Sequence, residues 1–127
     1  MSDIRKVAVN PPFLMNAPAY GFSHANRTGD TVYCSGQTSM AEGLEAQARE
    51  AFTNVRSLLA YAGANMADIV KMTIYSTDPE CWQKTAAVRA DFIKPPFPAT
   101  TMVIVKGLAL PQFLIEVDVT AVIGAGS

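Results

Sequence analysis

The stretch that decides the fold is Phe113-Leu114-Ile115-Glu116-Val117-Asp118-Val119-Thr120-Ala121-Val122. Its side chains alternate in character, and a period of two residues is typical of a β-strand. One side of the strand is wholly apolar and consists of Phe113, Ile115, Val117, Val119 and Ala121. The other side mixes carboxylates with other residues and consists of Leu114, Glu116, Asp118, Thr120 and Val122. We expect the first side to lie under helices and the second to pack against a partner subunit, leaving a crevice that holds water.

A long amphipathic helix is predicted over residues 43–62. Its apolar residues recur mostly at steps of three and four, and they are Leu44, Ala48, Ala51, Phe52, Val55, Leu58, Leu59 and Ala62. Gly63 follows them and favours the end of a helix. The segment is long enough for about five helical turns.

A second helix is predicted to start at Asp78, a good N-cap residue, with Pro79 in the first helical position. Four residues fall along one side of it, namely Trp82, Ala86, Arg89 and Ile93. The prolines Pro95-Pro96 end the element.

The remaining segments are predicted to be strands. Residues 22–27 and 31–36 form a hairpin around the turn Gly29-Asp30. Residues 68–76 alternate, with Val70, Met72 and Ile74 on one face. A further strand spans residues 100–106 and leads into the stretch quoted first. This order predicts an α/β (α+β) domain over residues 1–127, with a mixed sheet and two helices on one face.

Composition limits the possible partners. The 127 residues can bury one core without disulfides or a metal. Only 17% of residues are charged, against about 25% in a typical soluble domain, which favours an oligomer. The formal net charge is −1, and no run of basic residues exceeds Arg5-Lys6. We therefore expect neither nucleic acid nor an anionic membrane as a partner.

The same sequence predicts a cytoplasmic protein. The N-terminal residues 1–6 lead to Pro11-Pro12 without the apolar stretch of a signal peptide. No apolar run approaches the ~20 residues of a membrane span. Cys34 and Cys81 belong to no Cys-x-x-Cys or Cys/His pattern, so we expect free thiols and no metal site.

Residues 19–122 resemble the RidA family, the YjgF-type enamine/imine deaminases. Four segments carry the resemblance: Gly21-Phe22-Ser23-His24-Ala25, Ser35-Gly36-Gln37, Leu44-Glu45-Ala46-Gln47-Ala48-Arg49 and Leu114-Ile115-Glu116-Val117-Asp118. Their joint order makes an accidental match improbable. The resemblance implies a chorismate-mutase-like fold, a homotrimer with clefts between subunits, and hydrolysis of enamines and imines made by pyridoxal-phosphate enzymes. It implies no metal or organic cofactor.

The family's site residues transfer unevenly to this sequence. The glutamate that positions water or relays a proton is present as Glu116. The family's pocket-lining Ser-Gly pair is Ser35 and Gly36, where the backbone approaches the ligand. The carboxylate-binding arginine falls on Thr100, whose single hydroxyl carries no charge.

Three further positions complete the expected substrate pocket. The family's tyrosine falls on Phe22, and its asparagine falls on Ala86. We also expect Met102, in the same strand as Thr100, to line the pocket. A neutral or differently anchored substrate therefore fits this pocket better than an anionic 2-imino acid held by the family's arginine.

Each candidate also has a purely structural interpretation. Glu116 and Asp118 lie about 7 Å apart on one strand face, and both carboxylates could instead pair with basic residues across a subunit contact. His24 is more often a hydrogen-bonded edge residue than a base, and Cys34 more often a small buried residue than a nucleophile. Arg89 could supply the missing positive charge from a new direction, although packing with Trp82 is the simpler interpretation.

Two functions of different classes follow. The first is a RidA-type hydrolase that deaminates a small metabolite, or performs a related hydrolysis, with Glu116 as the general acid or base. The alternative is a trimer that binds a metabolite or a partner protein without turnover, which the changes at Thr100, Phe22 and Ala86 would also explain. Ribonuclease activity is poorly supported by the acidic balance of charge.

Overall fold

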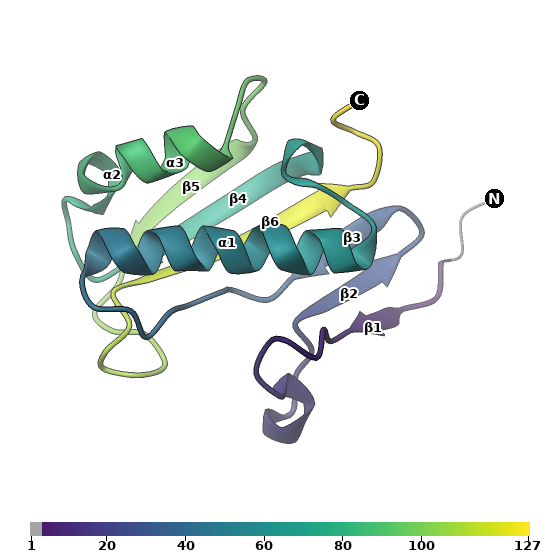
Figure 1. The fold of residues 1–127 in the computed structure, drawn as a ribbon, viewed down its shortest axis with the longest axis horizontal. Helices are drawn as coiled ribbons and strands as arrows, with labels where there is room; N and C mark the ends of the chain where they lie inside the picture. Colours follow the sequence, from purple (N-terminus) through teal and green to yellow (C-terminus); the bar gives the residue numbers. More distant parts are fainter. Residues whose placement is uncertain (1–3) are drawn as a thin grey trace.

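A six-stranded mixed sheet with helices on one face forms the protein in a computed structural model that describes residues 4–127 (Figure 1). The strands are β1 Val7–Val9, β2 Ala25–Thr28, β3 Thr31–Cys34, β4 Ile69–Ser76, β5 Ala99–Ile104 and β6 Ile115–Val122. Their order across the sheet is β1-β2-β3-β6-β4-β5. Among the strands of residues 4–127, only β4 and β5 run parallel. Residues 1–3, part of the N-terminal stretch considered above, lie outside the described residues.

The long predicted helix is confirmed as α1, Leu44–Ala62. It ends where Gly63 adopts a left-handed conformation with φ of 96°, which glycine reaches without steric cost. The amide of Gly63 donates to the carbonyl oxygen of Ala60 and thereby closes the last turn. Short 3-10 helices at Ala17–Tyr20 and Met66–Asp68 complete the loops.

The prediction of a single second helix is wrong in detail. The segment consists of two short helices, α2 Cys81–Lys84 and α3 Ala86–Phe92, which meet at Thr85. Glu80 is the N-cap of α2, whereas Asp78 accepts a hydrogen bond from the Glu80 amide at 2.8 Å. Asp78 is therefore used in a local turn before the helix, as short acidic side chains often are.

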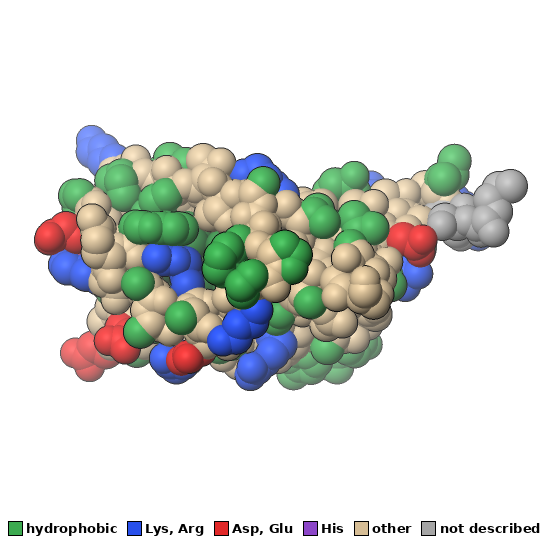
Figure 2. Space-filling view, turned by 90° about the horizontal axis from the view of Figure 1, so that it is seen from above, with side chains coloured by type: hydrophobic (Ala, Val, Ile, Leu, Met, Phe, Trp, Pro, Cys, Tyr) green, Lys and Arg blue, Asp and Glu red, His purple; other side chains and the backbone are tan. Residues whose placement is uncertain are grey.

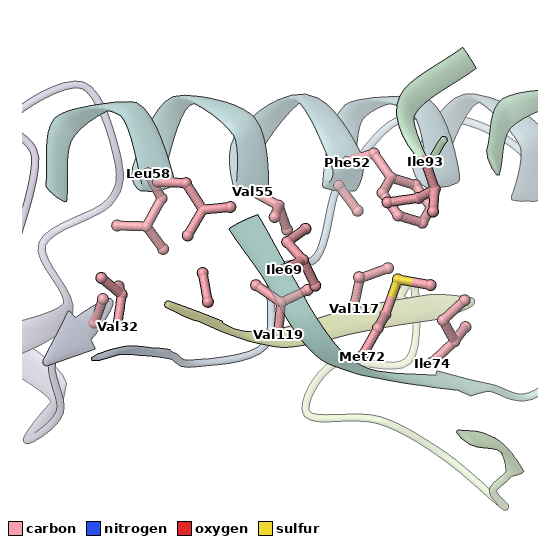
Figure 3. Close-up of a cluster of buried hydrophobic side chains, with 14 of the residues drawn as sticks. Val32, Phe52, Val55, Leu58, Ile69, Met72, Ile74, Ile93, Val117 and Val119 are labelled. Carbon is pink, nitrogen blue, oxygen red and sulfur yellow. The ribbon is translucent and has the colours of Figure 1, made fainter. Parts of the chain in front are cut away.

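The core lies between the helices and one face of the sheet. Figure 3 shows Leu58, Val55 and Phe52 pointing from α1 toward side chains of the sheet. The apolar side of β6 is buried as predicted, at Ile115, Val117, Val119 and Ala121. The ring of Phe92 in α3 stacks on that of Phe52, with centroids 5.5 Å apart. Both helical segments thus cover the same face, as predicted.

Val70 corrects the predicted pattern of β4. We expected it on the same face as Met72 and Ile74, which are both buried, but its side chain is 42% exposed. Ile69 pairs with Ala121 and Lys71 pairs with Thr120, so Val70 is an extra residue opposite β6. Such a bulge interrupts the alternation of faces. The predicted strands also extend too far, since residues 22–24, 35–36 and 113–114 lie outside β2, β3 and β6.

The other face of the sheet has no helix over it in Figure 1. It carries the second side of β6. The residues of β6 on that side are each only partly buried, namely Glu116, Asp118, Thr120 and Val122. Within residues 4–127, no helix is long and apolar enough to cross a membrane. Cys34 and Cys81 are both free thiols.

Candidate functional site

The predicted site residues fall into two groups on opposite faces of the sheet. Glu116 pairs with Tyr75, and both belong to the uncovered face. Thr100 pairs with Met72, whose side chain is buried on the helix face. Met102 pairs with Ile74 on that same face and packs against the core. One subunit therefore does not bring Glu116 and Thr100 into one pocket.

The first group is built around a close contact between Glu116 and Gly36. A β-carbon placed on Gly36 would lie 2.6 Å from both Cγ and Cδ of Glu116. With a β-carbon there the Glu116 side chain would have to move, so glycine at this position leaves the space that the glutamate occupies. We expected the backbone of Gly36 to approach a ligand, and in this structure the side chain of Glu116 occupies that space.

A β-bulge places Gly36 beside Glu116. Tyr33 pairs with Thr120, and the next bridge joins Gln37 to Val117. Three residues of one strand, 34–36, therefore lie opposite two residues of the other, 118–119. Extra residues of this kind bend a strand and occur often beside active sites.

Two residues hold the bulge in place, and sequence reasoning missed one of them. The buried His24 accepts at Nδ1 a hydrogen bond from Nε2 of Gln37 at 3.2 Å. Its Nε2 donates to the carbonyl oxygen of Met15 at 2.8 Å. Gln37 also donates to the carbonyl oxygen of Ser35 at 3.3 Å. His24 is thus the hydrogen-bonded residue we expected. In the sequence Gln37 was part of the Ser35-Gly36-Gln37 motif and had no role assigned to it. Its bond to His24 joins residues 13 positions apart, so no local pattern predicts it.

The other two members of this group are Ser35 and Phe22. The hydroxyl of Ser35 donates to the carbonyl oxygen of Ser23 at 2.7 Å, which ties the bulge to the segment before β2. Phe22 adjoins that segment, is 43% exposed, and makes an edge contact with His24 at 6.1 Å between ring centroids. Its exposed ring is available to a ligand or to another subunit.

The surroundings of Glu116 favour its neutral form. Desolvation by burial, and secondarily the charge of Asp118, raise the pKa of Glu116 above its ordinary value. Burial also raises the pKa of Asp118, although Lys71 opposes that shift. Burial and Asp118 together raise the pKa of Cys34 to about 12, so this thiol is not an activated nucleophile.

The raised pKa of Glu116 predicts a pH-dependent stability difference. The folded state binds the proton more tightly than the unfolded state, so stability falls as pH rises from 4.5, the ordinary value, through the folded pKa. Glu116→Gln removes this titration. We expect the stability of the variant relative to the wild type to increase as pH rises above 4.5, measured by urea unfolding at a series of pH values. A difference in unfolding free energy between variant and wild type that does not change with pH would contradict a raised pKa of Glu116.

Gly36→Ala is expected to destabilise the fold by about 1–3 kcal/mol, because the new methyl group overlaps the Glu116 side chain. Thermal unfolding measures the loss. Gly107→Ala is the matched control, since a β-carbon there meets nothing within 4 Å. Equal melting temperatures for the two variants would show that the contact between Gly36 and Glu116 is absent.

On the helix face, a cavity of about 470 Å³ lies between α2, α3 and the start of β5. Met102, which we expected to line the substrate pocket, is not among its lining residues and packs against the core instead. The four residues predicted to share one helical side all line the cavity, namely Trp82, Ala86, Arg89 and Ile93. Thr100 lines it as well, but its hydroxyl donates to the Pro98 carbonyl oxygen at 2.9 Å. The hydroxyl hydrogen of Thr100 is thus already used within the chain.

Within residues 4–127, no group of His, Cys, Asp or Glu side chains has the arrangement of a metal site. The chemistry available on the uncovered face is that of a partly buried carboxyl with a raised pKa, which can exchange a proton with water or a substrate. On the helix face, the available groups are an apolar cavity and one guanidinium.

These features define a single-domain α+β protein with a carboxyl group on the uncovered face of its mixed sheet. Residues 14–123 match the family model described as Endoribonuclease L-PSP. The chain belongs to this family, which includes the RidA and YjgF proteins.

Known relatives agree with this assignment. The chain is 36% identical over 104 residues to the RutC family protein YjgH of Escherichia coli, covering 76% of this chain and 79% of that protein. It is 32% identical over 94 residues to a 2-iminobutanoate/2-iminopropanoate deaminase of Dermatophagoides farinae, covering 68% of this chain and 73% of that protein. A crystal structure of a YjgF/YER057c/UK114 family member from Mycobacterium tuberculosis matches with a TM-score of 0.85 at 32% identity, covering 94% of this chain and all of that one.

Proposed function

We propose that residues 1–127 act as one RidA-like domain that hydrolyses a small enamine or imine, or carries out a related hydrolysis. The observation that carries this proposal is the carboxyl of Glu116, partly buried against Gly36 and with a raised pKa. As a base, its carboxylate takes a proton from water while the oxygen attacks the imine carbon. The proton then passes to the leaving nitrogen, so imine and water become a carbonyl compound and ammonia.

The relative from Dermatophagoides farinae supports this reaction class, since its name describes a deaminase of 2-imino acids. The substrate of the present chain is anchored differently. Thr100 stands where the family's arginine is expected and offers no charge-assisted bond, while Phe22 and Ala86 replace a tyrosine and an asparagine. The proposed reaction uses no metal and no organic cofactor.

We further propose that the protein is a homotrimer with its reactive clefts between subunits. Glu116 and Thr100 lie on opposite faces of one sheet, so a pocket containing both requires two subunits. The uncovered face carries partly buried apolar and hydroxyl residues that a partner subunit would cover, such as Val122 and Thr120. Each cleft would combine Glu116 and Gly36 of one subunit with the cavity at Thr100 of the next.

Other partners and the compartment follow from charge and cysteine chemistry. A net charge of −1 gives little attraction for RNA, so we do not extend the word endoribonuclease in the family description to this chain. The free thiols of Cys34 and Cys81 suit a reducing compartment, and we place the protein in the cytoplasm. Neither a nucleic acid nor a membrane is among its proposed partners.

A second candidate function is binding of a metabolite or partner protein without turnover. The observation that favours it is the joint replacement of three polar family residues at Thr100, Phe22 and Ala86. In this case the clefts keep their shape but lose the groups that orient a substrate.

Release of ammonia from enamines and imines generated in the reaction mixture tests the two functions. The hydrolase predicts that adding the protein raises the rate of ammonia release from at least one imine, enamine or amide, whereas Glu116→Gln does not. No acceleration with any of these substrates would overturn the hydrolase and favour the binding protein.

A further inference from the structure

Arg89 is held in place without any carboxylate partner. Its guanidinium carbon lies 3.5 Å from the centroid of the Trp82 ring, and its NH1 donates to the Thr85 hydroxyl at 2.8 Å. Among residues 4–127, no Asp or Glu lies within ion-pair distance of it. By contrast, Arg49 forms an ion pair with Asp91 at 3.0 Å. The charge of Arg89 is thus oriented but unneutralised.

This guanidinium lies at the wall of the cavity beside Thr100. The cavity is otherwise lined mostly by apolar side chains, among them Met72, Phe97 and Pro98. Figure 2 shows a hollow on the side of α2 and α3, with Lys or Arg atoms visible between hydrophobic side chains. Burial lowers the pKa of Arg89, but an arginine remains protonated in proteins. An incoming anion would therefore meet a partly desolvated, permanent positive charge.

We propose that this cavity binds a small organic anion, a carboxylate with an apolar body, and that Arg89 from α3 holds its anionic group. Stacking on Trp82 fixes the plane of the guanidinium, and four of its five N–H groups remain after the bond to Thr85. The apolar lining accepts the rest of the ligand. Thr100 cannot act as a second donor while its hydroxyl bonds to Pro98.

Such an anion would be the substrate class of the hydrolase proposed above, but its binding to the cavity can be tested without turnover. Trp82 is the chain's one tryptophan, so its fluorescence reports on this cavity alone. The probes are hexanoate and its neutral amide, hexanamide, which share the apolar body and differ in charge.

We expect hexanoate to change the fluorescence of Trp82 in a saturable way and to bind more tightly than hexanamide. In Arg89→Gln the affinity for hexanoate should fall about tenfold to a hundredfold, as expected for loss of charge-assisted hydrogen bonds. Arg49→Gln is the matched control and should bind as the wild type does. Arg89→Lys keeps the charge and should retain part of the affinity, which guards against a folding defect in the glutamine variant.

Three results would overturn this inference: equal affinity of the wild type for hexanoate and hexanamide, undiminished binding of hexanoate by Arg89→Gln, or no binding of either probe. Glu116→Gln separates the two proposals. If it binds hexanoate normally but the wild type hydrolyses nothing, the hydrolase fails and the anion site stands. If the wild type hydrolyses imines and Arg89→Gln binds hexanoate as tightly as the wild type does, the anion site is wrong and the hydrolase is unaffected.

Discussion

Replacing Glu116 with glutamine is expected to lower kcat for imine or enamine hydrolysis by about 100- to 10,000-fold, the usual contribution of a positioned acid or base. The amide has nearly the same shape as the carboxyl group, so it still fits against Gly36 but cannot take a proton from water. Steady-state kinetics with ammonia release as the readout measures the change. KM should change much less than kcat, because the substitution leaves the cavity on the other face of the sheet intact.

Asp118→Asn is the matched control for this result. Asp118 lies on the same face of β6, and its charge raises the pKa of Glu116. Removing that charge lowers the pKa of Glu116, so the carboxylate forms at lower pH and the acid limb of the pH–rate profile should move to lower pH. Most of the activity at neutral pH should remain. A Glu116→Gln enzyme as active as Asp118→Asn would exclude Glu116 as the base.

Introducing the family's arginine as Thr100→Arg is the second change with a large expected effect. Thr100 is exposed and lines the cavity, so a longer side chain there can reach a ligand without entering the core. A guanidinium can hold a carboxylate through two parallel hydrogen bonds, which a hydroxyl cannot. We expect kcat/KM for 2-imino acids to rise about tenfold to a hundredfold.

Thr101→Arg controls for the added positive charge. Thr101 pairs with Thr73 and so belongs to the opposite face of the sheet from Thr100. The gain should be absent in this variant and absent for imines that lack a carboxylate. A similar gain in both variants would show that the effect comes from general attraction of anions and not from a defined site.

The regular parts of the fold were predictable from the sequence. The apolar period of residues 44–62 and the alternation along β6 depend on local spacing, and both predictions are confirmed. The failures have two different causes, a long-range pairing at Val70 and a local side-chain contact at Thr85. Val70 is exposed because pairing with β6 inserts a bulge, and the second helix divides at Thr85, whose hydroxyl donates to the Cys81 carbonyl oxygen at 2.6 Å.

The candidate site was predictable only in part. The resemblance identified Glu116 and Gly36, but their contact depends on an extra residue where β3 continues beside β6, and no local pattern signals it. Arg89 was noted on the same helical side as Trp82, yet the cavity that both line also requires β4 and β5. The placement of Glu116 and Thr100 on opposite faces depends on strand register, which the sequence did not reveal.

If two subunits complete each site, a mixture of two inactive variants should regain activity. Glu116→Gln removes the base, while Ala86→Trp fills the cavity at an exposed position. If the two halves come from neighbouring subunits, random mixed trimers contain intact sites at about one interface in four, and about a quarter of wild-type activity should return. Activity that stays at the average of the two separate variants, after unfolding and refolding them together, would contradict a shared site.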